Sequence, residues 1–331
     1  MQNKITKRTP LLNENGKLTN EIGYAYEMMY DYERSLISSS QLRVKEWDFY
    51  QFHNNEFVVQ LTIGHSGYAG TCCCTMFEFA TGNRWENVVP LILPMKKLNL
   101  PSRTDIPNTV KFENKNFKMF YEVTDTTRRL VAKGNNVDID VTMQQPHRDG
   151  MVIVVPFDKS EQFYLNHKIN CMPTNGKVRI KDKEVEFTNA MGLLDWGRGV
   201  WPYRQQWWWG NGGTTIDGVP FGFNVGWGFG NPVTTENMLF YDGKGSKLEG
   251  VKAEVDTTDY MKPWTFHSTD GRFEMVFTPT YDNYTNMNFI IAHNYCHQVW
   301  GKFNGKAILD DGKIIEVKDM LAFCEHSCNR W

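Results

Sequence analysis

The sequence has no large excess of charge of either sign. Its 36 Lys and Arg side chains are balanced by 38 Asp and Glu side chains, which gives a formal charge of -2. A protein that binds nucleic acid needs a basic surplus to neutralise phosphates. The near balance therefore predicts that nucleic acid is not a partner.

Long apolar runs are also missing. No stretch of about 18 apolar residues occurs anywhere, and the opening segment MQNKITKRTPLL holds no apolar core of signal-peptide length. We therefore expect neither a transmembrane segment nor a secretory leader, and we predict a cytoplasmic location.

The cysteines lack the pattern of a disulfide framework. There are seven, an odd number, and Cys72, Cys73 and Cys74 are consecutive, so that neighbours on a strand would face opposite sides. The histidines at 293 and 297 and the cysteines at 324 and 328 have no companion pair at zinc-finger spacing. Reduced thiols are expected, as in a cytoplasmic protein, without a metal or another cofactor.

Several catalytic motifs are absent as well. The sequence contains no phosphate-binding P-loop, no dinucleotide fingerprint and no Gly-x-Ser-x-Gly elbow. The Gly-rich segment 226–230 follows a strand-like run but opens no helical pattern. Phosphoryl transfer, hydride transfer and serine hydrolysis are therefore disfavoured.

Aromatic residues and glycines are plentiful, with 11 Trp, 14 Tyr, 21 Phe and 27 Gly. Aromatic residues favour strands, whereas Gly next to Asp or Asn marks turns. Short runs of alternating apolar residues lie at 57–63, 117–123, 137–141, 151–155, 177–180, 184–187, 221–225, 273–278, 289–292, 306–309 and 313–317. One short helix is expected within 21–37. The pattern predicts an all-β fold of barrel or sandwich type.

Three internal echoes occur in the same order along the chain. Trp47 stands 16 residues before Ile63, and Trp209 stands 16 residues before Val225. The segment 117–121 resembles 273–277, and the segment 175–201 resembles 304–331 with one inserted residue, so that Asp195 aligns with Glu325. Chance repetition of hairpin chemistry is the alternative. A duplication predicts an N-terminal extension (1–44) followed by two tandem lipocalin-like antiparallel β-barrels (45–203 and 204–331), each able to hold one small ligand.

The segment 192–212 is the richest in chemical groups, with five tryptophans between positions 196 and 209. It lies between the two proposed barrels, where ligand sites are common. Asp195 among indoles would be hard to ionise and is the candidate general acid. Arg198 could instead hold it ionised, and an Asp–Arg pair with packed Trp could equally lock a domain junction.

The remaining candidates complete this hypothetical site. Arg198 and Tyr203 would orient the acid or stabilise negative charge, and Glu325 is a second acid. The ligand-binding candidates are Trp47, Trp196, Trp201, Trp207, Trp209 and Asn224. Indole faces could exclude water and stabilise a carbocation. Asn224 could equally face solvent, and Trp47 could simply plug a barrel rim.

Residues 42–50, the motif Asp-Trp-Gly-Arg-Gly-Val-Trp-Pro-Tyr at 195–203 and the tail 301–331 resemble a large family of bacterial and protist proteins of unknown function. That family is distantly similar in fold to the tandem lipocalin-like group of hydroxyneurosporene synthase (carotenoid 1,2-hydratase) and kievitone hydratase. This resemblance implies β-barrels that enclose apolar substrates and protonate a carbon–carbon double bond.

Two functional hypotheses follow. The first is a cofactor-free, hydratase-like lyase or isomerase that protonates a hydrophobic unsaturated small molecule through a carboxylic acid. The second is a carrier that binds an apolar or sugar-like ligand without chemistry.

Overall fold

A computed structural model describes residues 2–94, 97–231, 233–288 and 292–330. The chain divides into two compact units. Residues 4–201 form the first unit, and residues 202–331 form the second together with the first three residues of the chain. In the described ranges the structure is almost entirely β, with only two short 3-10 turns, at Arg34–Leu36 and Gln41–Arg43. The expected strand 289–292 falls largely on residues outside these ranges.

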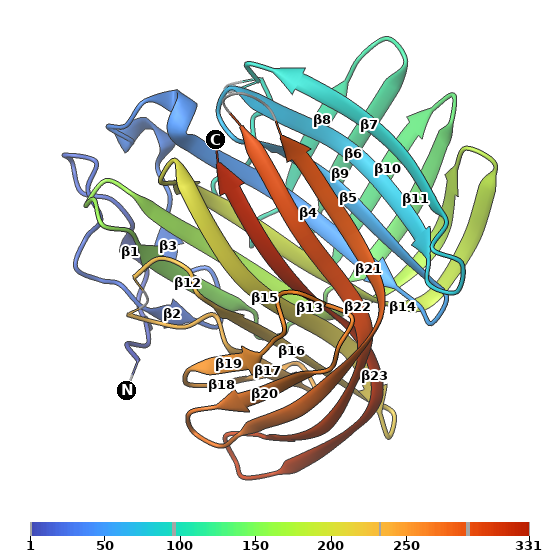
Figure 1. The fold of residues 1–331 in the computed structure, drawn as a ribbon. Coiled ribbons are helices and arrows are strands. Elements are labelled where there is room, and N and C mark those ends of the chain that lie inside the picture. Colours follow the sequence, from blue (N-terminus) through green and yellow to red (C-terminus); the bar gives the residue numbers. More distant parts are fainter. Residues whose placement is uncertain (1, 95–96, 232, 289–291, 331) are drawn as a thin grey trace. The chain divides into compact units, whose positions relative to one another are not determined.

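The first unit is built on one curled antiparallel sheet (Figure 1). Its strands follow the order β7 (Arg84–Ile92), β6 (Ala69–Glu78), β5 (Phe57–His65), β4 (Val44–His53), β14 (Lys183–Val200), β13 (Phe163–Ile180), β11 (Val137–Gln144), β10 (Thr127–Gly134), β9 (Phe117–Val123) and β8 (Asn108–Glu113). The long strand β13 pairs with β11 through its residues 174–180 and with β12 (Met151–Pro156) through its residues 163–168. A further short strand, β2 (Tyr24–Ala25), pairs with β12. A separate parallel pair joins β1 (Thr9–Pro10) to β3 (Tyr30–Asp31).

The second unit repeats the plan with nine strands. Their order is β18 (Lys244–Lys247), β17 (Met238–Tyr241), β16 (Val219–Trp227), β15 (Arg204–Ile216), β23 (Ile314–Arg330), β22 (His293–Ile308), β21 (Phe273–Asn288), β20 (Trp264–Ser268) and β19 (Val251–Glu254). In each unit a four-stranded meander pairs its first strand with the last strand of that unit. The expected all-β, lipocalin-like class is confirmed, with each sheet a curled half-barrel whose terminal strands are not paired to each other in the described ranges.

The expected helix within 21–37 is wrong. This segment instead contains β2, β3 and a single 3-10 turn. Tyr30 and Tyr32 are both buried, at 0% and 3% exposure. Burial at every second position suits an extended chain, because helical neighbours two apart lie on different faces.

One of the sequence echoes is visible in detail. Gly176 and Gly305 have φ angles of 141° and 147°, and each lies at an irregularity in the pairing of its strands. Asn175 and Asn304 use their side-chain oxygens to accept a backbone N–H of the following strand, both at 2.9 Å. The alignment of 175–201 with 304–331 is therefore confirmed at its bulge.

The first echo is out of step with this alignment. Phe49 lies opposite Asp195, whereas Trp209 lies opposite Glu325. If Asp195 corresponds to Glu325, then Trp209 corresponds to Phe49, and the residue that matches Trp47 is Trp207. The alignment based on the spacing of 16 residues is therefore shifted by two residues from the one that the strand pairing gives. Such a shift is hard to detect in the sequence, because side chains on a strand return to the same face at every second position.

Each half-barrel has its own apolar core on one face of the sheet. In β4, and in β14 from Ala190 onwards, the even-numbered side chains face this core, among them Tyr50, Phe52, Leu194 and Trp196. In the second unit Trp208 packs against the core that contains Val225, Val299 and Cys324. We call these the core faces, and the opposite surfaces of the sheets the outer faces.

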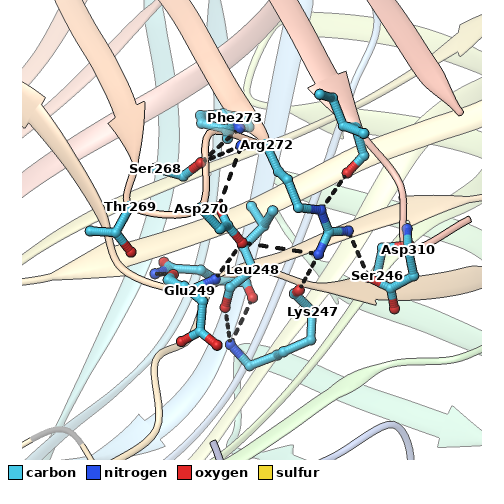
Figure 2. A network of polar contacts seen from close by, with 12 residues as sticks. Ser246, Lys247, Leu248, Glu249, Ser268, Thr269, Asp270, Arg272, Phe273 and Asp310 are labelled. Carbon is cyan, nitrogen blue, oxygen red and sulfur yellow. Dashed lines mark hydrogen bonds and ion pairs between the residues drawn. The ribbon is translucent and has the colours of Figure 1, made fainter. Parts of the chain in front are cut away.

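A network of hydrogen bonds and ion pairs connects residues 246–249, 268–273 and 310 of the second unit (Figure 2). The Arg272 guanidinium donates to the carbonyl of Lys247 at 2.9 Å and to the carboxylate of Asp310 at 2.6 Å. Partly buried Lys247 donates to the carbonyls of Asn237 and Leu248, at 2.9 and 2.8 Å. These bonds join the turns between short strands. In the described part of the chain, no helix is both long and apolar enough to cross a membrane.

Candidate functional site

Strand alternation divides the Asp195–Trp201 motif between the two faces of β14. Asp195, Gly197 and Gly199 lie on the outer face, and Trp196 and Arg198 point into the core of the first unit. The residues of the motif therefore belong to two different environments, one on each face of β14.

On the outer face, Asp195 accepts three hydrogen bonds. One oxygen receives the ammonium of Lys168 at 2.8 Å and the amide of Asn166 at 2.7 Å, and the other receives the indole N–H of Trp47 at 3.2 Å. Lys168 is 2% exposed and Asp195 is 8% exposed. The cation that pairs with Asp195 is thus Lys168, and not Arg198 as the sequence spacing suggested, because residues three apart on a strand face opposite sides.

The two glycines of the motif make room for indole rings. A Cβ on Gly197 would lie 2.1 Å from a ring carbon of Trp47, and one on Gly199 would lie 2.8 Å from the indole nitrogen of Trp201. Trp47 stacks on Tyr164 with ring centroids 5.7 Å apart, and Trp201 packs edge-on to both. The motif is explained locally by this aromatic cluster, which Asp195 joins through Trp47.

Inside the first unit, Arg198 is completely buried. It donates to Asp48 at 2.8 Å and to the carbonyl of Pro101 at 2.9 Å, and its guanidinium lies 4.0 Å from the ring centroid of Trp196. One nitrogen is 4.0 Å from Glu46. These contacts make Arg198 the centre of a buried ion cluster rather than the partner of the outer-face acid.

Glu46 is the most strongly paired anion of this cluster. Tyr32 donates to it at 2.6 Å, Arg34 approaches to 2.6 Å, and His65 is 3.1 Å away. Burial alone would raise the pKa of Glu46, but the His65 hydrogen bond and the charges of Arg198 and Arg34 bring it down to about 2. Burial raises the pKa of Asp48 despite Arg198. The cluster is therefore built around an ionised Glu46.

In the second unit four sequence candidates share the outer face. The indole of Trp207 donates to Glu325 at 2.9 Å, which repeats the geometry of Trp47 and Asp195. The indole of Trp209 donates to Asn224 at 2.7 Å. Asn224 is 0% exposed, so it faces neither solvent nor a solvent-open cavity. Tyr203, another candidate, is 39% exposed.

The structure thus groups the candidates by unit. Those of the first unit are Trp47, Asp195, Trp196, Arg198 and Trp201, and those of the second unit are Tyr203, Trp207, Trp209, Asn224 and Glu325. Within each unit it joins an indole to a carboxylate. Their assigned roles in catalysis and ligand binding remain predictions.

The core face of the second unit carries a ladder of rings that the sequence reasoning missed. Tyr284, His297, His326, Trp208 and Trp227 lie directly opposite one another on five successive strands, β21, β22, β23, β15 and β16. We call this set the ring ladder. His326 stacks on Trp208 with centroids 3.8 Å apart and parallel planes, and Tyr284 stacks on His297 at 4.5 Å. Tyr284, at one end of the ladder, is 47% exposed, and the other four rings are partly buried.

A chain of hydrogen bonds crosses the ring ladder. Asp282 is 2.6 Å from Nδ1 of His297, whose Nε2 is 2.8 Å from the Tyr295 hydroxyl. Tyr295 is hydrogen-bonded to Tyr260, and the Tyr260 hydroxyl is 2.6 Å from Nδ1 of His326. We call these five residues the Asp–His–Tyr chain. It links a carboxylate, two imidazoles and two phenols in one continuous path.

Burial keeps one imidazole and one phenol of this chain uncharged near pH 7. Burial, with the nearby His297, lowers the pKa of His326 to about 4, so its imidazole is neutral near pH 7. Burial also raises the pKa of Tyr260, which keeps this phenol protonated. Asp282 holds the His297 ring in place, as a carboxylate does in hydrolytic triads. The chain can accept a proton at an imidazole and supply one from a phenol.

A signal for this chain was present in the sequence. Asp282 and Tyr284, like Tyr295 and His297, are two residues apart on strands, and so share a face. His297 was weighed only as a metal ligand, at a spacing of four from His293. The decisive partner, Tyr260, precedes β20, and no periodicity connects it with His326.

Comparison with solved structures finds a similar fold in the crystal structure of kievitone hydratase from Nectria haematococca. The TM-score is 0.53 at 11% sequence identity, over 87% of this chain and 88% of the other. A search of curated proteins finds no match. A family model described as a domain of unknown function, DUF2804, matches residues 2–331. The chain therefore belongs to the DUF2804 family.

Proposed function

We propose that this protein is a hydratase-like lyase or isomerase that acts on a hydrophobic, unsaturated small molecule, with the Asp–His–Tyr chain of the second unit as its acid–base machinery. The observation that carries the proposal is the connected path from Asp282 through His297 to Tyr295, with heavy-atom distances of 2.6 and 2.8 Å. Such distances lie within the reach needed for proton transfer.

The chemistry requires one proton donor and one proton acceptor. In a hydration, a proton adds to one carbon of the double bond, water adds to the other carbon, and that water loses a proton. The hydroxyls of Tyr295 and Tyr260 are the acids in this proposal, and His297, oriented by Asp282, is the base. The path between them returns the proton to the acid, so no cofactor is consumed.

The surroundings fit an apolar substrate with developing positive charge. The indole of Trp208 is stacked between His326 and Trp227, whereas Tyr284 stacks on His297 and is 47% exposed. The accessible ring of Tyr284 would attract a developing positive charge and so stabilise a carbocation. The fold is shared with a protein named as a hydratase, and this agrees with the proposal at the level of fold alone.

Asp195 fits the role of proton donor less well. Its two oxygens accept three hydrogen bonds, one of them from an ammonium. A carboxylate in this arrangement acts as an acceptor. We therefore assign the acid to the second unit, and substitution of Asp195 tests that assignment.

The test uses a panel of unsaturated isoprenoids, lipids and polyphenols incubated in ¹⁸O-labelled water or in D₂O. Hydration appears as a mass gain of one labelled water, and isomerisation appears as deuterium uptake. The variants His297→Gln and Tyr295→Phe should lose activity by about 100-fold or more.

His267→Gln is the matched control. His267 lies 2.6 Å from Glu274 in the same unit, but it is exposed and is not part of the Asp–His–Tyr chain. Its activity should equal that of the wild type. Binding of a panel member without any turnover would favour the carrier hypothesis instead, and equal turnover by His297→Gln would refute the assigned machinery.

A further inference from the structure

The interior of the first unit contains two buried guanidiniums, those of Arg128 and Arg198, and two buried carboxylates, those of Glu46 and Asp48. Arg34, whose side chain is 28% exposed, also pairs with Glu46, so both carboxylates are engaged by Arg34 and Arg198 and neither contacts Arg128 directly. The nearby His167 adds no further positive charge, since burial lowers its pKa to about 3 and it is neutral at pH 7. Buried charges are costly unless they are compensated.

Arg128 is the guanidinium without a carboxylate. It is 2% exposed, and in the described part of the chain its hydrogen bonds go to neutral oxygens only. It donates to the Tyr50 hydroxyl at 3.0 Å, to the carbonyl of Thr104 at 2.7 Å, and to the side chain of Gln145. Arg34 and Arg198, by contrast, contact Glu46 and Asp48 directly.

Two buried phenols accompany Arg128. Tyr50 on β4 and Tyr121 on β9 meet across the core, with ring centroids 4.8 Å apart. Tyr121 is 0% exposed, and its hydroxyl has no hydrogen-bond partner among the described residues. The Tyr50 hydroxyl accepts the bond from Arg128, so its own proton remains available for donation. A buried hydroxyl without a partner is uncommon and needs an explanation.

We propose that Arg128, Tyr50 and Tyr121 form a binding site for an oxyanion, the carboxylate or phenolate of a small apolar molecule. An oxyanion would give Arg128 a directly paired negative charge and would accept hydrogen bonds from both phenols. The rest of the molecule would be apolar, because Tyr50 and Tyr121 belong to the main hydrophobic cluster of the first unit. This site is separate from the Asp–His–Tyr chain, and the inference does not rest on the proposed function.

Isothermal titration of the full chain at pH 8 with two anions and their neutral analogues tests the site. The probes are cinnamate against cinnamide and 4-nitrophenolate against 4-nitroanisole. We expect at least one anion to bind, its neutral analogue to bind at least tenfold more weakly, and Tyr121→Phe to weaken the anion at least tenfold. Comparison of the two anions identifies which oxyanion the site takes.

Tyr121→Phe is a clean variant, because it removes no hydrogen bond that the structure describes, and its melting temperature should not fall. Tyr30→Phe is the control, since Tyr30 is a buried tyrosine of the same unit whose hydroxyl lies 3.4 Å from the carbonyl of Gly23. It should bind like the wild type. The inference is overturned if neither anion binds, if the neutral analogues bind equally well, or if Tyr121→Phe binds as the wild type does.

Discussion

The two units carry the same pair of strands, and they fill its two faces differently. On the outer face, Trp47 with Asp195 and Trp207 with Glu325 repeat one indole–carboxylate contact, at 3.2 and 2.9 Å. On the core face, the register set by these pairs makes Trp196 correspond to His326, Arg198 to Cys328, and Asp48 to Trp208. One core face therefore holds charges, whereas the other holds stacked rings and imidazoles.

The two units are thus alike on their outer faces and differ on their core faces. The outer-face contact is present in both units, as expected for a contact that positions strands. The core face carries an ion cluster in one unit and the partly exposed Asp–His–Tyr chain in the other. A substrate requires access as well as reactive groups, and Tyr284, at the end of the ring ladder, is 47% exposed.

The largest expected effect concerns the ion cluster of the first unit. Arg198→Met leaves Asp48 without its guanidinium, and removing one partner of a buried pair costs about 3–5 kcal/mol. The melting temperature should fall by roughly 10 °C. Arg129→Met is the control, because its pair with Asp140 is exposed and is worth about 1 kcal/mol or less. Equal losses in the two variants would contradict a special role for the cluster.

A smaller loss is expected from the crowded motif glycine. In Gly197→Ala the new methyl group overlaps the ring of Trp47, and overpacking of this kind costs about 1–3 kcal/mol. Gly250→Ala is the control, because its nearest contact would be an ordinary 3.4 Å from Thr269. Urea unfolding of both variants measures the difference. If Gly197→Ala were as stable as the wild type, the fit between glycine and indole would be disproved.

Acid should cost the two units different amounts of stability. Burial lowers the pKa of His53 to about 4 and that of His167 to about 3, and both lie in the first unit, whereas the second contains His326. These histidines are neutral when folded and charge near pH 6.5 when unfolded. Stability is therefore complete above about pH 6.5 and falls towards pH 4, by about 2 kcal/mol for each histidine at pH 5.

Urea unfolding at pH 7.5 and pH 5 checks this sign. The paired carboxyl of Glu46, with a pKa of about 2, contributes its full stability above about pH 4.5 and loses it only at lower pH, so it does not affect a comparison of pH 7.5 with pH 5. His53→Gln should reduce the pH dependence, and His147→Gln, at an exposed position, should leave it unchanged. A protein as stable at pH 5 as at pH 7.5 would show that these imidazoles are not held neutral.

The smallest effects test the correspondence between the units. Trp47→Phe and Trp207→Phe each remove one indole hydrogen bond to a carboxylate, worth about 1 kcal/mol. Similar losses in thermal unfolding would support the matched register. A loss of stability in only one of the two variants would show that the Trp47–Asp195 and Trp207–Glu325 contacts are not equivalent.

The sequence predicted the fold class well, because period-two alternation and Asp-Gly turns are local signals. The correspondence of Gly176 with Gly305 was also readable, since both follow an asparagine and precede a lysine, but that they form bulges was not predicted. The register of the first echo was not readable, because a shift of two residues leaves each side chain on the same face.

The candidate sites were harder to predict, since they depend on contacts across strands. Sequence proximity suggested that Arg198 pairs with Asp195, although the cation comes from Lys168 on the neighbouring strand. The Asp–His–Tyr chain joins residues that lie up to 66 positions apart, as Tyr260 and His326 do. No motif spacing records such a contact.

The most direct test of the account compares two variants on whichever substrate of the panel is turned over. We predict that His297→Gln lowers kcat/KM by about 100-fold or more, and that Asp195→Asn stays within about threefold of the wild type. If Asp195→Asn is the inactive variant while His297→Gln retains full activity, or if no panel member is turned over, the assignment of the chemistry to the second unit is contradicted.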